Sequence, residues 1–121
     1  MPSILIVDDD EGMTETLADI FAARRYDVAT AVNGESAVAR VSDDRFDVVL
    51  MDVKMPGIDG VDALLAMKRR TPDLKVIMMT AFTQDDRVAR ALDAKAVAVL
   101  PKPLDLECVL RLVGRVTGAR A

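Results

Sequence analysis

The chain has no histidine, no tryptophan and a single cysteine, Cys108, among its 121 residues. Without histidine it cannot form a Ser-His-Asp or Cys-His catalytic site. With one thiol it can form neither an internal disulfide bond nor a zinc site of cysteine and histidine. We expect Cys108 to be a buried thiol on a helix, without a chemical role.

Long hydrophobic runs and an excess of positive charge are also missing. The longest apolar run near the N-terminus, residues 4–7, is too short for a signal peptide or a membrane span, so we expect a cytoplasmic protein without membrane contact. The net charge of −4 and the pI of about 4.8 argue against direct binding of nucleic acid. The chain has no low-complexity linker, which predicts one domain over residues 1–121.

Short apolar runs alternate with segments of helical periodicity along the chain. The runs predict five strands, at residues 4–7, 28–31, 48–51, 76–79 and 97–100. Most are rich in β-branched residues and lack polar alternation, as strands covered by helices on both faces do. We therefore predict an α/β protein, a three-layer (βα)5 sandwich with a parallel sheet. Right-handed crossovers leave few topologies open, and among the known ones we expect the flavodoxin-like order 2-1-3-4-5.

Five helices are predicted between and after these strands. Asn33 and Asp105 are expected to cap the second and last helices, Asp59 or Gly60 begins the third, and the fourth covers about residues 84–94. The residues expected to face the core are, in chain order, Met13, Leu17, Ile20 and Phe21; Val38 and Val41; Val61, Leu64 and Leu65; Val88, Ala91 and Leu92; and Leu106, Val109, Leu110 and Val113.

Acidic residues gather where the first and third predicted strands end. Asp8 and Asp9 directly follow the first strand, and Asp52 follows the third. Neighbouring like charges raise one another's pKa, so such a cluster is tolerated mainly where a cation or phosphoryl chemistry uses it. In a sheet of this order the ligand crevice lies at the carboxyl ends of strands 1 and 3. We expect these three carboxylates to meet there.

Two further strand ends contribute polar groups to the same crevice. The fourth strand ends in Thr80, and Lys102 follows the fifth. Carboxylates with open water positions suit Mg²⁺, and a central aspartate can attack phosphorus to form an acyl phosphate. Lys102 and the metal would then neutralise the phosphoryl oxygens, and the Thr80 hydroxyl can donate to one of them.

These motifs resemble the receiver domains of two-component response regulators, of the chemotaxis-receiver type, over essentially the whole chain. The matching segments are residues 4–11, 50–60, 79–82 and 100–104. The resemblance implies that Asp52 is the phosphoacceptor, Thr80 the switch hydroxyl and Lys102 the base that contacts the phosphoryl group. It also implies a cis Lys102–Pro103 bond and Mg²⁺ held by Asp8, Asp9, Asp52 and the backbone carbonyl of Lys54. Asp10 is expected only to cap the first helix.

The resemblance implies a phosphorelay switch. Asp52 would take its phosphoryl group from a phosphohistidine of a sensor histidine kinase or histidine phosphotransfer protein and signal to a downstream effector through a two-state equilibrium. No enzymatic activity is expected beyond the protein's own phosphorylation and dephosphorylation. The protein would be a monomer or a phosphorylation-dependent dimer, and its end just past the last helix slightly favours a stand-alone regulator.

Two other functions remain open at this point. One is a pseudo-receiver that acts by binding alone, which the intact acids, Thr80 and Lys102 argue against. The other is a small phosphatase that resembles the haloacid dehalogenases, with Asp8 as nucleophile. That family has Thr or Val where Gly12 stands, and it needs a longer chain.

The chain departs from the receiver pattern around the fifth strand. Val99 stands where receivers usually carry Tyr or Phe, so the aromatic half of the switch is missing. Val97 and Ala98 replace common acids, and Lys95 replaces a usual glycine. Either strand packing or a modified partner or self-association surface explains this apolar edge.

Two large side chains flank the path that a hydrolysing water takes in this family. Lys54 and Phe82 each lie two residues beyond a site residue, Asp52 and Thr80 respectively. We expect both to slow the attack of water, which predicts a long-lived phosphoryl group.

Overall fold

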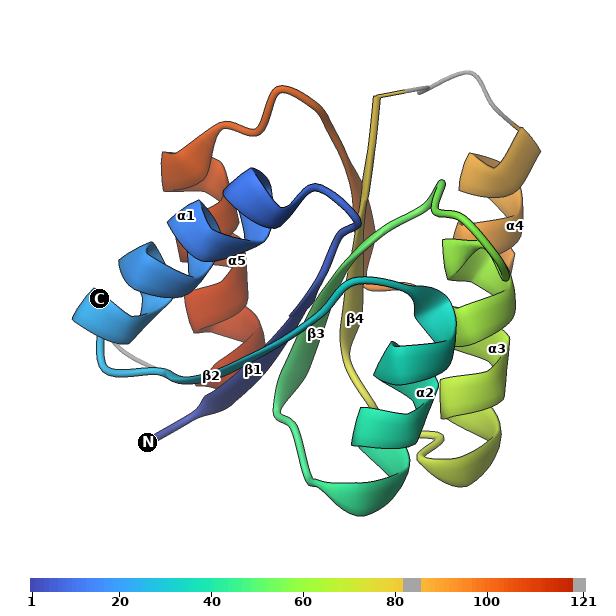
Figure 1. Ribbon diagram of the computed structural model, residues 1–121, viewed down its shortest axis with the longest axis horizontal. Coiled ribbons are helices and arrows are strands. Elements are labelled where there is room, and N and C mark those ends of the chain that lie inside the picture. The colour runs from blue at the N-terminus through green and yellow to red at the C-terminus, as the bar shows by residue number, and fades with distance from the viewer. Residues whose placement is uncertain (82–85, 119–121) are drawn as a thin grey trace.

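The computed structural model describes residues 1–81 and 86–118, which form one parallel sheet between two layers of helices (Figure 1). The sheet order is β2-β1-β3-β4-β5, as the sequence predicts. The strands are β1 (Ser3–Val7), β2 (Asp27–Ala31), β3 (Val48–Asp52), β4 (Val76–Thr80) and β5 (Ala98–Pro101). The fifth strand therefore begins one residue later than predicted and includes Pro101.

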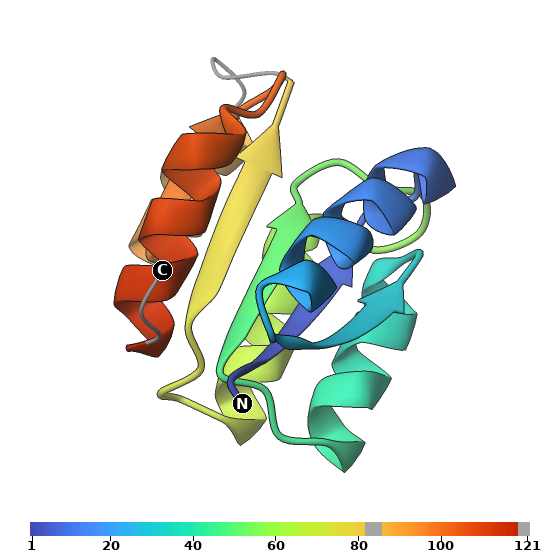
Figure 2. The same ribbon diagram turned by 90° about the vertical axis from the view of Figure 1, so that its left-hand side faces the viewer.

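Helices α1 and α5 cover one face of the sheet, and α2, α3 and α4 cover the other (Figures 1 and 2). Their bounds are α1 (Glu11–Ala23), α2 (Gly34–Asp43), α3 (Gly60–Arg70), α4 (Asp86–Asp93) and α5 (Leu106–Thr117). The capping predictions are confirmed: the side chains of Asn33, Asp59 and Asp105 accept hydrogen bonds from the first turns of α2, α3 and α5. The predicted start of the fourth helix, at about Gln84, lies outside the described residues.

The core consists of one apolar layer on each face of the sheet. Alternate residues of β1 point to opposite layers: Ile4 and Ile6 pack with α1 and α5, and Leu5 and Val7 pack on the side of α2 and α3. Every residue of β3 and β4 is buried, which confirms that these strands are covered on both faces.

The predicted helix faces are only partly right. Leu65, Leu92 and Leu106 were expected in the core but are 39%, 51% and 40% exposed. In α3 the buried face is centred on Val61, Leu64 and Met67, which turns Leu65 toward solvent. In α5 the first turn, with Leu106, is exposed, and the buried residues are Val109 and Val113.

Two smaller predictions about side chains are wrong. Cys108 is exposed, because it lies on the solvent side of α5 next to the buried Val109. In α1 the buried residues are Thr14, Leu17 and Phe21, and Ile20 is only partly buried at the edge of this face. Both errors arise because several rotations of a helix satisfy the same apolar spacing.

Among the described residues, two that are not glycine have a left-handed backbone. They are Arg25, with φ of 68°, in the turn after α1, and Lys95, with φ of 69°, in the turn after α4. Glycine adopts this conformation without the steric penalty that a Cβ atom brings, which explains why glycine is usual at the position of Lys95. The described helices include none with the length and apolar character needed to cross a membrane.

Candidate functional site

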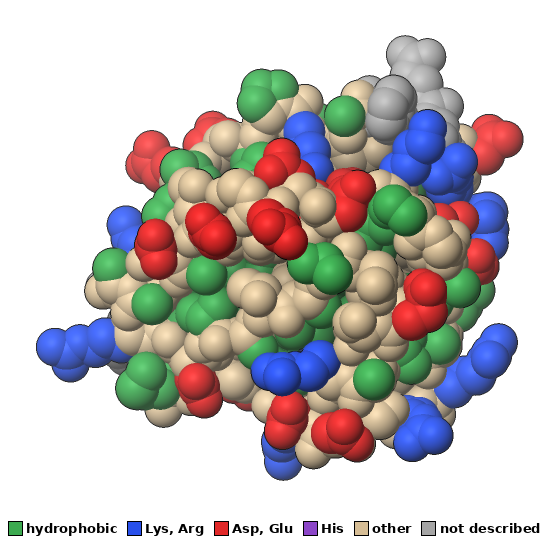
Figure 3. Space-filling model, viewed as in Figure 1, with side chains coloured by type: hydrophobic (Ala, Val, Ile, Leu, Met, Phe, Trp, Pro, Cys, Tyr) green, Lys and Arg blue, Asp and Glu red, His purple; other side chains and the backbone are tan. Residues whose placement is uncertain are grey.

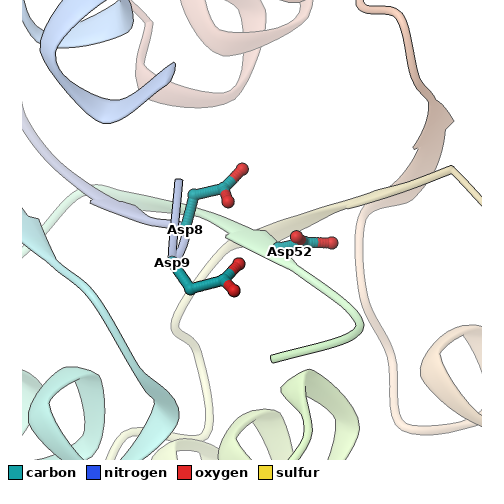
Figure 4. Close-up of side chains that lie close together, drawn as sticks. All are labelled: Asp8, Asp9 and Asp52. Carbon is teal, nitrogen blue, oxygen red and sulfur yellow. The ribbon is translucent and has the colours of Figure 1, made fainter. Parts of the chain in front are cut away.

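The residues singled out from the sequence meet at the carboxyl edge of the sheet. Asp8 and Asp9 follow β1, and Asp52 is the last residue of the neighbouring strand β3. Figure 4 shows their three carboxylates turned toward a shared space. One oxygen from each lies within 4.8 Å of the others, close enough for all three to contact a single metal ion. Asp8 and Asp52 are buried, whereas Asp9 is exposed at the rim.

Lys102 joins the two buried carboxylates. Its Nζ donates to Asp8 Oδ2 at 2.8 Å and to Asp52 Oδ2 at 3.1 Å. The lysine side chain is mostly buried, so these charge-assisted bonds are stronger than surface ion pairs. The ammonium therefore offsets part of the repulsion that the sequence predicts for this cluster.

The environment of the site shifts the pKa values of Asp52 and Lys102. Burial raises the pKa of Asp52 above its usual value, and the Asp8 charge adds to this effect although Lys102 opposes it. Burial alone would lower the pKa of Lys102, but its hydrogen bonds and charge interactions with Asp8 and Asp52 raise that pKa instead. Three carboxylates and one ammonium group therefore meet at this site, and a bound cation would offset the excess of negative charge.

Thr80 lies at the same edge, as the last residue of β4, and is buried. Its backbone oxygen accepts a hydrogen bond from the backbone nitrogen of Lys102 at 2.8 Å, which connects the end of β4 to the segment after β5. The Lys102–Pro103 bond is cis, as the resemblance implies. Phe82, expected to flank the site, lies outside the described residues.

The position of Asp52 depends on Gly60, where the sequence predicts a turn beside Asp52 and the start of the third helix. Gly60 N donates to Val53 O at 2.6 Å. A Cβ atom at Gly60 would clash with the backbone oxygen of Asp52 and would lie 2.8 Å from Val53 Cα. Only glycine lets α3 begin this close to the end of β3. The Asp59-Gly60 pair was visible in the sequence, but this close approach was not.

The loop between β3 and α3 is also held from α2. Glu35 Oε1 accepts a hydrogen bond from Ile58 N at 3.2 Å, and Gly57 takes a left-handed φ of 82° beneath the Glu35 carboxylate. Closer to the site, Lys54 N donates to Asp52 Oδ1 at 3.4 Å. No sequence signal distinguished Glu35 from an ordinary surface glutamate in the first turn of a helix.

Asp10 and Val99 have structural roles, one in helix capping and the other in strand packing. Asp10 caps α1 by accepting from Met13 N at 3.2 Å, as expected. Val99 is partly buried against the apolar layer on the side of α2 to α4, which favours strand packing at this position. Val97, just before β5, keeps a 39% exposed apolar side chain.

Comparisons with known proteins agree with the fold. The sporulation initiation phosphotransferase F of Bacillus subtilis is 36% identical over 104 residues, which cover 86% of this chain and 84% of that protein. The transcriptional regulatory protein ZraR of Salmonella typhimurium is 38% identical over 104 residues. That match covers 86% of this chain but 24% of ZraR, so the similarity is to one part of a longer protein.

Solved structures and a family match extend this similarity. The response regulator protein TrrA of Thermotoga maritima, solved in complex with Mg²⁺ and BeF, has a TM-score of 0.83 at 27% identity, covering 96% of this chain and 99% of that one. Residues 4–113 match the response regulator receiver domain family. This chain therefore belongs to the response regulator receiver domains and functions in phosphorylation-dependent signalling.

Proposed function

We propose that Asp52 is the residue that becomes phosphorylated, in a Mg²⁺-dependent reaction with a phosphohistidine of a partner. The partner would be a sensor histidine kinase or a histidine phosphotransfer protein, and we expect both proteins in the cytoplasm. The observation that carries this proposal is the Lys102 ammonium bound to both Asp8 and Asp52 beside a third carboxylate. A buried acid with this surplus of negative charge is suited to receive a metal ion and a phosphoryl group.

The donor set fits Mg²⁺. The proposed ligands are oxygen atoms: the carboxylates of Asp8, Asp9 and Asp52 and the backbone carbonyl of Lys54, a set that suits a hard divalent cation. When bound, Mg²⁺ would neutralise the acceptor carboxylate and the oxygens of the incoming phosphoryl group. The raised pKa of Asp52 agrees with this assignment, because burial disfavours the ionised carboxylate and a bound cation would offset that cost.

The protein's own groups then have distinct roles. An oxygen of the ionised Asp52 attacks phosphorus, and the bond from phosphorus to the donor's histidine nitrogen breaks, leaving its electron pair on that nitrogen. Lys102 holds the acceptor carboxylate before the reaction and can donate to a phosphoryl oxygen afterwards. Thr80 is placed at the adjacent strand end, where its hydroxyl would bind a phosphoryl oxygen and pass the change to β4 and β5.

The phosphorylated form would favour one of two conformations that a downstream effector distinguishes. We expect the active state to be a monomer or a phosphorylation-dependent dimer, without direct contact to nucleic acid or membrane. Catalysis would be limited to the protein's own phosphorylation and dephosphorylation. Neither the pseudo-receiver nor the phosphatase alternative is favoured, because the family match covers most of the chain and the acid cluster is intact.

The test is intact-mass analysis over time after addition of acetyl phosphate, with and without Mg²⁺. Wild type should gain one phosphoryl group only with Mg²⁺, and Asp52→Ala should gain none. Asp10→Ala is the matched control, because Asp10 is a neighbouring acid that caps α1, and it should be phosphorylated like wild type. A gain in Asp52→Ala would assign the phosphoacceptor to another residue, and no gain in wild type would favour the pseudo-receiver.

A further inference from the structure

A cluster of lysines lies at the end of the sheet opposite the acidic site. Lys68 is in the last turn of α3, Lys75 directly precedes β4, and Lys95 lies shortly before β5. Val97 N donates to Val76 O at 2.8 Å, so the starts of β4 and β5 are adjacent and bring Lys75 and Lys95 to one edge. Figure 3 shows basic side chains near the lower end of α3, the end away from the carboxyl ends of the strands.

The lysines of this cluster repel one another. Burial lowers the pKa of Lys68, and the charges of Lys75 and Lys95 lower it further, with Asp73 opposing them. The Lys68 ammonium nevertheless stays within the cluster, where it donates to the Pro72 carbonyl oxygen at 3.5 Å. Like charges held together in a protein of net charge −4 are a local feature, not a consequence of overall composition.

The backbone conformation of Lys95 is a second, independent feature that destabilises the folded protein. Its φ of 69° places a Cβ atom in the left-handed region, where glycine would be free of strain. The conformation itself is required by the turn from α4 to β5, but a lysine side chain at this position is not. A strained residue that also contributes charge to a repulsive cluster points to a use for that charge.

We propose that Lys68, Lys75 and Lys95 form a docking site for an acidic segment of a partner protein. Charge complementarity carries the choice of partner. Three neighbouring ammonium groups match a short run of carboxylates, whereas a nucleic acid would carry its phosphates beyond the cluster along a protein of net charge −4. The cluster lies at the amino ends of β4 and β5, so an occupant leaves the acidic site open, and the proposal does not depend on phosphorylation of Asp52.

The test measures binding and stability in the same variants. The binding probe is a fluorescein-labelled peptide of ten glutamates, followed by fluorescence anisotropy at an ionic strength of about 0.1 M, where the Debye length is about 10 Å. Lys95→Gly should weaken binding by about twofold to fivefold, since one exposed charge is removed, and should raise Tm by about 3 °C, since strain is removed. The double variant Lys68→Gln/Lys75→Gln should weaken binding by about tenfold.

Matched controls exist within the chain. Arg25→Gly removes one positive charge and one left-handed residue at the far edge of the sheet, next to β2. It should raise Tm as Lys95→Gly does but leave peptide affinity unchanged. Arg40→Gln/Arg111→Gln removes the same number of charges as the lysine double variant, from exposed positions on α2 and α5, and should bind like wild type.

Four results would overturn the proposal. They are absence of peptide binding by wild type, equal loss of affinity in Arg25→Gly and Lys95→Gly, a lower Tm in Lys95→Gly, and tighter binding of a single-stranded DNA with the same number of charges as the peptide. Sedimentation without peptide provides a further check. A concentration-dependent dimer that Lys68→Gln/Lys75→Gln abolishes would be a fifth contrary result, because it would assign the surface to a second copy of this chain.

Discussion

The two ends of the sheet carry clusters of opposite charge, which differ in burial and in how far the charges are neutralised. At the carboxyl end, Asp8 and Asp52 repel each other, but Lys102 lies between them and binds both. At the amino end, burial lowers the pKa of Lys68, the charges of Lys75 and Lys95 lower it further, and Asp73 opposes them. Asp8 and Asp52 are thus buried and partly neutralised, whereas Lys75 and Lys95 are exposed to solvent and Lys68 is only partly buried.

This difference helps to distinguish a buried chemical site from an exposed binding surface. Buried charges must be compensated inside the protein, so a change at the acidic end should alter folding stability and chemistry together. Exposed charges are screened by water and salt, so a change at the basic end should alter binding with little loss of stability. The following predictions test this contrast, beginning with the largest expected effect.

Gly60→Ala should be the most damaging single change near the acidic end. The added methyl group would clash with the backbone of Asp52 and Val53, and neither backbone segment can move without displacing β3. We expect a loss of about 3 kcal/mol in the free energy of unfolding, measured by urea denaturation, together with impaired phosphorylation. Gly12→Ala is the control, because its methyl group would meet only Asp10 Oδ1 at 3.3 Å. Equal losses in both variants would contradict the close-approach argument.

Lys102→Met should have the next largest effect. Removal of the ammonium leaves Asp8 and Asp52 buried without their shared partner, and we expect a loss of about 2 kcal/mol at pH 7. Addition of Mg²⁺ should restore part of this loss, because a cation can replace the missing charge. At the other end, Lys75→Met should change stability by less than about 0.5 kcal/mol. A similar loss in both variants would remove the contrast between the two ends.

Asp52→Asn should stabilise the metal-free protein by about 1 kcal/mol at pH 7, because it relieves the burial and repulsion that raise the Asp52 pKa. Asp52→Ala should also have a higher Tm than wild type. The folded state holds the Asp52 proton more tightly than the unfolded chain, so wild-type stability falls as pH rises from the ordinary aspartate pKa of about 3.9 through the higher folded-state value. The advantage of the variant should therefore disappear below about pH 4.

Thermal unfolding of wild type and Asp52→Asn from pH 3 to pH 8, without and with Mg²⁺, measures this effect. Asp19→Asn, which changes an exposed acid on α1, should leave the pH profile as in wild type. Mg²⁺ should stabilise wild type more than Asp52→Asn, since the variant has lost a proposed ligand. A drop of several degrees in the Tm of the metal-free variant would show that Asp52 is not under electrostatic strain.

Lys54→Ala should have the smallest effect on folding and act on the phosphoryl lifetime. Lys54 follows Asp52 in the loop before α3, and we expect its long side chain to hinder the approach of water. The half-life of the phosphorylated protein in Mg²⁺ should fall by about threefold, which corresponds to less than about 1 kcal/mol in the barrier. Mass spectrometry over time measures this half-life. An unchanged half-life, or a wild-type half-life of seconds, would contradict the hypothesis that Lys54 slows hydrolysis.

The strands and the position of the acidic site followed from local patterns, whereas the strand order was chosen from the few topologies known for such sheets. Apolar runs such as residues 48–51 can be recognised without knowledge of their neighbours, and parallel strands have their carboxyl ends at one edge. The buried faces of the helices were predicted less accurately from the sequence, because Leu65 and Leu92 satisfy the apolar spacing and yet are exposed to solvent. Which side of a helix is buried depends on how far it rotates against the sheet, and the spacing alone permits several rotations.

The amino-acid sequence by itself determined the α/β fold and the residues that gather at the carboxyl ends of the strands, because these depend on short patterns and on the direction of the chain. The tertiary structure decided three contacts between distant segments: Lys102 bound between Asp8 and Asp52, Gly60 packed against the backbone of β3, and the lysines brought together beside β4. Each contact joins residues from different elements, and their distance is set by the packing of helices on the sheet rather than by any local pattern.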